Sequence, residues 1–76
     1  MKKPVRVRFG NRVRTVRLRA GLTQEDVAHK ARMDRGYLSN IENGHVNVSL
    51  ETIDLIARGI GVSMFILMPD YPLPVE

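Results

Sequence analysis

Apolar residues near the start of the chain recur at the spacing of one helix face. They stand at i, i+4, i+7 and i+11, as Phe9, Val13, Val16 and Ala20. This period predicts a helix with one buried side. Gly21 follows directly and is expected to end that helix.

Residues 1–8, before this helix, are predicted to form a basic arm with an extended backbone, because Pro4 is followed by alternating apolar and basic residues. The alternation also leaves a β-hairpin open as an alternative. In that case Val5–Phe9 and Arg12–Val16 would pair across a turn at Gly10-Asn11. Of the two patterns, the helical spacing is favoured.

Two short helices are predicted next, each introduced by a residue that caps helices. Thr23 is expected to begin the first, with Asp26 completing a weak capping box. Its inner face contains Val27, Ala28 and Ala31. Asp34 is expected to begin the second, which covers Arg35–Asn43 and ends at Gly44.

The second half of the chain predicts two further helices. Ser49 caps the first, and Gly61 ends it. The inner face of that helix contains Leu50, Ile53, Ile56, Ala57 and Ile60. Ser63 caps a short fifth helix over Met64–Met68, which Pro69 stops because proline clashes inside a helix. The predicted fold class is therefore all-α, with five helices.

The second and third predicted helices are separated only by Arg32, Met33 and Asp34. Two short helices joined so closely cross at a steep angle, which is the helix-turn-helix geometry. On a helical wheel of residues 35–43, Leu38 and Ile41 point inward. Tyr37 and Glu42 lie at the flanks, and the outer face contains Arg35, Gly36, Ser39, Asn40 and Asn43.

This outer face has the chemistry of a major-groove reader. Arginine bonds bidentately to guanine, asparagine bonds bidentately to adenine, and serine is a smaller, adaptable contact. Every amphipathic helix also has a polar solvent face, so the wheel alone leaves both interpretations open.

Charge is distributed unevenly along the chain. Residues 1–19 contain eight basic and no acidic residues, whereas residues 20–76 contain four basic and eight acidic ones, so local charges of +8 and −4 give the net +4. The eight are Lys2, Lys3, Arg6, Arg8, Arg12, Arg14, Arg17 and Arg19. Such polarity indicates a polyanion partner, nucleic acid before an anionic membrane, or else a solvated tail without a partner.

Composition excludes several classes of protein. A chain of 76 residues allows one small domain with a thin core, and the 43% of hydrophobic residues argues against disorder. Without cysteine, and with only His29 and His45 as histidines, no metal site is predicted. No Ser–His–Asp set, phosphate loop, membrane span or secretory signal is found, so we predict no enzyme, no cofactor and a cytoplasmic location.

Three segments of the chain follow one another in a characteristic order. They are Leu22-Thr23-Gln24-Glu25-Asp26-Val27-Ala28, Tyr37-Leu38-Ser39-Asn40-Ile41-Glu42-Asn43-Gly44 and Asn47-Val48-Ser49-Leu50-Glu51-Thr52-Ile53. In order and spacing they resemble the Cro/C1-type (Xre family) helix-turn-helix domain. The resemblance covers roughly residues 9–68 and implies a lambda-repressor-like five-helix DNA-binding bundle, preceded by the arm 1–8 and followed by a proline-rich tail, 69–76. Residues 34–39 are also similar to the controller proteins of restriction–modification systems.

The resemblance identifies residues 35–43 as the recognition helix. It implies base contacts by Arg35, Gly36, Ser39 and Asn40. It implies DNA phosphate contacts by Gln24, Asn43, His45 and Asn47. Gly36 departs from the family in substance because it offers no side chain, so either it permits close approach to the DNA or its base pair goes unread.

The resemblance also implies an ion pair between Arg17 and Glu42, which would orient the recognition helix rather than add much stability. In the tight turn, Arg32 stands where the family usually has glycine. A left-handed backbone there costs a non-glycine residue about 1–2 kcal/mol. Either the turn differs from that of the family, or Arg32 accepts the strain.

A thin core cannot cover every apolar residue of this chain. The expected surplus is Leu55, Met64, Phe65, Met68 and Tyr71. A clustered apolar patch on a small protein marks an interface, whereas scattered exposed apolar residues are ordinary. We interpret this set as a homodimer contact, which would place two recognition helices about 34 Å apart on a pseudo-palindromic site.

The leading hypothesis is therefore a homodimeric, sequence-specific transcriptional regulator that binds double-stranded DNA at the nucleoid. No membrane and no small-molecule ligand are expected as partners. The alternative is an antitoxin-type protein-interaction module of the same fold. A third hypothesis, a membrane or RNA binder driven by residues 1–19, is disfavoured by the mixed charge of the capped helices.

Overall fold

The computed structural model describes residues 3–74, which form four α-helices and one 3-10 helix. The elements are α1 (Val5–Arg19), α2 (Gln24–Ala31), α3 (Arg35–Glu42), α4 (Leu50–Ile60) and η1 (Met64–Leu67). No strand occurs in residues 3–74, so the all-α prediction is confirmed and the β-hairpin alternative is wrong. The predictions for Lys2, for the start of the arm and for the last two residues of the tail lie outside the described residues.

The predicted fifth helix is wrong in type, because Met64–Leu67 form a 3-10 helix rather than an α-helix. Ser63 caps this segment by accepting a hydrogen bond from the N–H of Phe65 at 3.2 Å. Pro69 follows so soon that only one turn fits between the cap and the proline. Segments of one turn favour the tighter i→i+3 bonds of a 3-10 helix.

The first helix begins at Val5 rather than Phe9, so residues 5–8 are helical and not extended. Pro4 stands just before the helix, where its missing N–H removes no intrahelical bond. Its carbonyl oxygen accepts hydrogen bonds from Val7 and Arg8 at 3.0 and 3.2 Å. The prediction of an extended arm is therefore wrong for residues 5–8, because Pro4 provides a helix start that the apolar–basic alternation did not reveal.

The other helix starts lie where the capping residues predict. Thr23, Asp34 and Ser49 each accept a hydrogen bond from a backbone N–H in the first turn. The ends are also alike, because each α-helix is followed by a left-handed residue: Gly21, Arg32, Gly44 and Gly61. Arg32 has a φ of 55°, so of the two alternatives for this turn the structure has Arg32 in the strained left-handed conformation.

The core lies where α2 crosses α4 and where α1 crosses α3, with η1 packed on α1 and α4. Its members are Phe9, Val13, Val16, Val27, Ala28, Leu38, Ile41, Ile53, Ile56, Ala57, Ile60 and Leu67. Two residues predicted to face inward are exposed, Ala20 at the end of α1 and Leu50, which is 71% exposed, at the start of α4. A helical wheel shows which way a side chain points, but it does not show whether another element packs over it. At these two helix ends, no element of residues 3–74 does.

Two helical glycines mark the closest approaches between helices. A Cβ on Gly10 of α1 would lie 2.7 Å from the carbonyl oxygen of Glu42, and one on Gly59 of α4 would lie 3.0 Å from that of Val27. The distance at Gly10 is too short for a Cβ atom and a backbone oxygen, and the distance at Gly59 is tighter than most such contacts. Glycine at these positions therefore allows α3 and α2 to reach their places.

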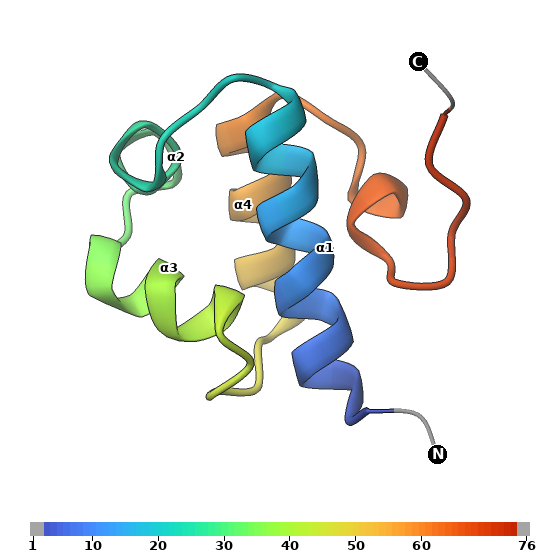
Figure 1. The fold of residues 1–76 in the computed structure, drawn as a ribbon. Helices are drawn as coiled ribbons and strands as arrows, with labels where there is room; N and C mark the ends of the chain where they lie inside the picture. The colour runs from blue at the N-terminus through green and yellow to red at the C-terminus, as the bar shows by residue number, and fades with distance from the viewer. Residues whose placement is uncertain (1–2, 75–76) are drawn as a thin grey trace.

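The C-terminal segment is held on α1 by arginines. Arg12 donates to the carbonyl oxygens of Ile66 and Pro69 at 2.9 and 2.8 Å. Arg8 pairs with Asp70 at 3.3 Å, and Arg19 donates to the carbonyl oxygen of Pro74 at 3.2 Å. Figure 1 shows α1 between α3 on one side and η1 with this segment on the other.

These contacts change the interpretation of the basic segment. Five of the six arginines in residues 1–19 bond to acceptors of their own chain: Arg8, Arg12, Arg14, Arg17 and Arg19. Most of these arginines therefore also hold the fold together, but only Arg8 and Arg17 have a carboxylate as their main partner, so much of the positive charge remains. No helix within residues 3–74 has the length and apolarity needed to cross a bilayer.

Candidate nucleic-acid interface

The third helix has two sharply different sides. Leu38 and Ile41 are 0% and 1% exposed and pack into the core, as predicted. Arg35, Gly36 and Asn40 are exposed on the other side, and Ser39 is half-buried beside them. The side with hydrogen-bonding groups is therefore open to a partner over most of the helix.

Gly36 lies beside the side chain that caps α3. Asp34 caps α3 through its Oδ2 atom, which accepts from the N–H of Tyr37 at 3.3 Å. A Cβ on Gly36 would lie 2.8 Å from the same oxygen. Because this oxygen ends a flexible side chain, a small shift of Asp34 would make room for a Cβ, so the main effect of glycine is to remove a side chain from the outer surface of the first turn.

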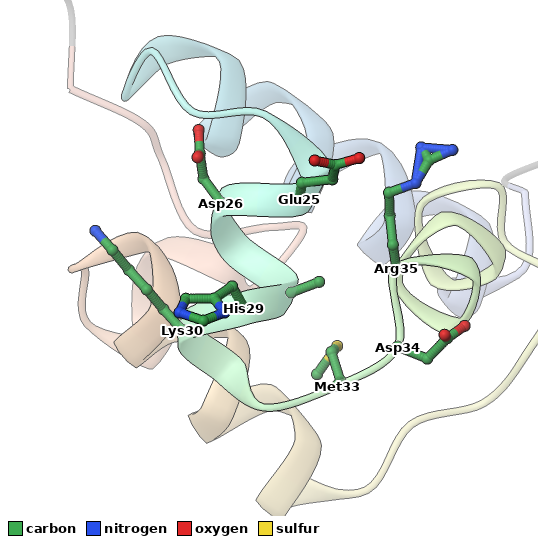
Figure 2. A pocket seen from close by; sticks show the side chains of 8 residues that line it. Glu25, Asp26, His29, Lys30, Met33, Asp34 and Arg35 are labelled. Carbon is green, nitrogen blue, oxygen red and sulfur yellow. The ribbon is translucent and has the colours of Figure 1, made fainter.

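The start of α3 borders an open groove of about 540 Å³ beside α2. Figure 2 shows the guanidinium of Arg35 extending outward from the first residue of α3, with the carboxylate of Glu25 projecting from α2 on the same side. His29 and Lys30 border the groove as exposed side chains of α2. Among residues 3–74, no hydrogen-bond acceptor holds the guanidinium of Arg35, so it is available to an external one.

Glu42, placed at a flank by the wheel, is buried at the meeting point of three helices. Arg17 of α1 grips its carboxylate with two hydrogen bonds, of 2.7 and 3.0 Å. Gln24 of α2 donates to the carboxylate at 3.1 Å, and Arg14 of α1 lies 3.5 Å from it. The Arg17–Glu42 pair implied by the family resemblance is thus present, at the centre of a larger network.

The same network sets the ionisation of Glu42. Burial alone raises the pKa of its carboxyl group, because a charge is costly away from water. The hydrogen bonds from Arg17, Gln24 and Arg14, with the positive charge of Arg17, outweigh that effect and lower the pKa below its ordinary value. Glu42 is therefore an ionised anchor that fixes α3 against α1 and the start of α2.

Gln24 and Asn43, two of the expected phosphate contacts, are engaged within the protein. Gln24 is half-buried and uses one amide hydrogen on Glu42, which leaves its second amide hydrogen for another acceptor. Asn43, at the end of α3, accepts a hydrogen bond from Arg14 at 3.1 Å. His45 and Asn47 are exposed in the loop before α4.

Gly10 and Arg14 are two neighbours of α3 that the wheel of the third helix could not reveal. Both lie on the face of α1 turned toward α3, and the sequence contained a signal for them. Gly10, Arg14 and Arg17 are spaced i, i+4 and i+7, so the pairing expected for Arg17 already placed the other two on the same face.

The expected dimer residues lie on α4, η1 and the segment after it. Leu55, Phe65 and Tyr71 are exposed, while Met64 and Met68 are half-buried. The rings of Phe65 and Tyr71 are 6.0 Å apart between centroids, in contact across the turn after η1. Figure 1 places η1 and the C-terminal segment on the opposite side of α1 from α3.

Comparison with known proteins agrees with this geometry. The helix-turn-helix family model matches residues 13–67, more than half of the chain. Control protein C.MunI from Mycoplasma sp is 39% identical over 67 residues, which cover 87% of this chain and 90% of that protein.

Solved structures are similar over a comparable length. The restriction–modification controller protein C.AhdI from Aeromonas hydrophila has a TM-score of 0.79 and 37% identity, over 82% of this chain and 94% of that one. The controller protein C.Esp1396I, solved as a tetramer with its natural 35 base-pair operator, has a TM-score of 0.79 and 32% identity, over 87% of each chain. The matched proteins are regulators and not enzymes. The chain therefore belongs to the Cro/C1-type helix-turn-helix family of DNA-binding transcriptional regulators, and it is similar to the restriction–modification controller proteins of that family.

Proposed function

We propose that the protein is a homodimeric, sequence-specific regulator that reads the major groove of a pseudo-palindromic operator with α3. The observation that carries this proposal is the two-sided α3, with Leu38 and Ile41 buried and hydrogen-bonding groups exposed. The relative C.Esp1396I, which is 32% identical, binds its operator as a tetramer.

The base contacts follow from the chemistry of the exposed side of α3. Arg35 matches the paired acceptors of guanine, and Asn40 matches the donor and acceptor of adenine. Ser39 is half-buried and suits a short contact from the helix surface. Gly36 has no side chain to keep the first turn of α3 away from the floor of the groove.

The DNA backbone contacts are proposed for residues that flank α3. They are Gln24, Asn43, His45 and Asn47. Gln24 is the first residue of α2, where free N–H groups and the helix dipole favour an anion. The other three lie at the end of α3 and in the loop before α4, so phosphates would be held on both sides of the reading helix.

The dimer contact is proposed for Leu55, Met64, Phe65, Met68 and Tyr71. Four of them lie on η1 and the C-terminal segment, on the opposite side of α1 from α3 (Figure 1), so pairing there leaves both copies of α3 free. Two copies are needed because each good base contact contributes only about 1–3 kcal/mol of discrimination. A DNA partner of this kind would hold the protein at the nucleoid of a bacterial cell.

The test of the DNA proposal is selection of binding sites from a random duplex library, followed by gel-shift titration at several salt concentrations. A selected site with two related half-sites, bound far more tightly than random DNA, is expected. Binding that ignores sequence at every salt concentration would contradict it and favour the antitoxin-type interaction module.

The test of the dimer proposal is sedimentation equilibrium of the purified protein and of a Phe65→Ser variant. We expect the natural protein to be dimeric and the variant to shift toward monomer while its circular dichroism is unchanged. As a control, Leu50→Ser changes an equally exposed apolar residue outside the proposed contact. An equal shift in both variants, or in neither, would remove this surface as the dimer contact.

A further inference from the structure

Arg14 of α1 lies beside α3, and the carboxylate of Glu42 neutralises its positive charge only in part. Two guanidinium groups, those of Arg14 and Arg17, face the single carboxylate of Glu42. Arg17 takes both carboxylate oxygens at 2.7 and 3.0 Å, whereas Arg14 approaches one of them at only 3.5 Å. The pair formed by Arg17 and Glu42 is neutral, so this cluster keeps one net positive charge, carried by Arg14.

Arg14 is also placed to act outside the protein. Its side chain is 47% exposed, whereas that of Arg17 is only 9% exposed. Arg8, Arg12 and Arg19 are bound to the C-terminal segment on another side of α1. Arg14 therefore presents its charge next to the end of α3.

The contact between Arg14 and Asn43 fixes the direction of an amide. A guanidinium group only donates hydrogen bonds, so the atom of Asn43 that faces Arg14 at 3.1 Å is the amide oxygen. The amide nitrogen of Asn43 remains as a donor, and no acceptor for it occurs among residues 3–74. Phosphate oxygens only accept, so this orientation presents the half of the amide that a phosphate requires.

We propose that Arg14 is a further DNA-backbone residue, which orients the amide of Asn43 and adds its own positive charge to the same phosphate clamp. This inference rests on the proposed DNA-binding function and names a residue of that site. Arg14 carries no sequence information in this role, because contacts to phosphate set position and affinity but not base preference.

The test compares Arg14→Gln with Arg58→Gln by gel-shift titration on the selected operator and on random duplex DNA. Arg58 is an exposed arginine of α4 that pairs only with Asp54, so its variant controls for the loss of one charge. Each phosphate contact adds about 0.9 to the slope of log affinity against log salt. The proposed homodimer contains two copies of Arg14, so Arg14→Gln is expected to lower that slope by about 1.8 on both DNAs, which corresponds to about sixtyfold weaker binding at 0.1 M salt.

A double-mutant cycle with Asn43→Ala tests the orienting role. If Arg14 sets the direction of the Asn43 amide, Asn43→Ala weakens binding less in the Arg14→Gln background than in the natural protein. Arg14→Lys keeps the charge without the planar donor pair, so it should keep the salt slope and lose the coupling to Asn43. This variant also carries the test if Arg14→Gln does not fold.

A salt slope in Arg14→Gln equal to that of Arg58→Gln, together with additive effects of Arg14 and Asn43, would overturn the inference. It would leave Arg14 with a structural role, visible only as a lower melting temperature. Failure of the natural protein to bind DNA would instead contradict the proposed function, so the two failures are distinguishable.

Discussion

Gly10 of α1 lies directly against the carbonyl oxygen of Ile41 on α3, with no room between them for a Cβ atom. The carbonyl oxygen of Glu42 would lie 2.7 Å from the same Cβ. Both neighbouring oxygens belong to the backbone of α3, so they cannot move aside as the end of a side chain would. The absence of a side chain at residue 10 therefore sets how closely α1 and α3 approach each other.

Gly10→Ala is expected to destabilise the protein, although alanine favours helices. The gain in helix propensity is about 1 kcal/mol, and the forced separation of α1 from α3 costs about 1–3 kcal/mol or more. Chemical denaturation measures the difference, with the neighbouring exposed Asn11→Ala as the control for propensity alone. A variant more stable than the natural protein would show that α3 yields to the added methyl group.

Stability is expected to fall as the pH drops below the ordinary pKa of Glu42, which is 4.5. The pKa of Glu42 is lowered in the folded protein, so the folded state holds this proton less tightly than the unfolded state does. The stabilisation is complete above the unfolded pKa and is lost as the pH falls through the folded pKa. The free energy of unfolding should therefore be flat near neutral pH and decline in acid.

Glu42→Gln is expected to cost about 3–5 kcal/mol at neutral pH, because it leaves the buried guanidinium of Arg17 without its counter-charge. Its acid decline should also be shallower. Asp26, whose pKa is lowered by hydrogen bonds from Thr23, is present in both proteins and does not contribute to the difference. Parallel pH curves for the two proteins would contradict the assignment to Glu42.

Arg35→Ala is expected to relax base preference at one base pair of each half-site, at a cost of about 1–3 kcal/mol per site. Preference at other positions should remain, because Asn40 and Ser39 are unchanged. Repeated site selection with the variant measures this directly. Retained preference at every position would refute a base-reading role for Arg35.

Arg12→Ala is expected to loosen the C-terminal segment from α1. Arg12 makes two hydrogen bonds from a charged group to the carbonyls of Ile66 and Pro69, and such bonds contribute about 1.5–3 kcal/mol each at most. We expect a lower melting temperature and faster amide exchange at Met68 and Tyr71. Arg58→Ala, which breaks only an exposed pair, should change little. Equal changes in melting temperature and amide exchange in the two variants would argue against a role for Arg12 in holding the C-terminal segment on α1.

Arg32→Gly is expected to stabilise the protein by about 1 kcal/mol, because glycine adopts the left-handed conformation of this turn without strain. Arg58→Gly, inside α4, should instead lose about 1 kcal/mol. Denaturation midpoints of the two variants should therefore move in opposite directions. A loss of stability in both would show that the strain at Arg32 is compensated elsewhere.

The fold was predictable where the signal is local. Caps such as Thr23 and Ser49 and stops such as Gly61 act within a few residues, so the pattern gave the helix starts and ends. The start of α1 and the state of Leu50 were not predictable in this way. They depend on which distant elements cover a surface, and a wheel does not contain that information.

The sequence predicted which way the side chains of α3 face, but it did not predict which residues of the other helices contact them. The wheel placed Leu38 inward and Arg35 outward, as the structure has them. It placed Glu42 at a flank, because the residues that bury it come from α1 and α2. Counting charges likewise did not show that Arg12 holds the C-terminal segment, since the carbonyl oxygens that it binds lie more than fifty residues away along the chain.

The separate caps of α2 and α3 have an evolutionary consequence. The side chains of Thr23 and Asp34 cap the starts of α2 and α3, and the buried Leu38 and Ile41 anchor α3 in the core. None of these bonds involves the side chains of Arg35 or Asn40. If these two side chains read bases as proposed, substitutions at residues 35 and 40 can change the preferred DNA sequence without disturbing the caps and core contacts that hold α3 in place.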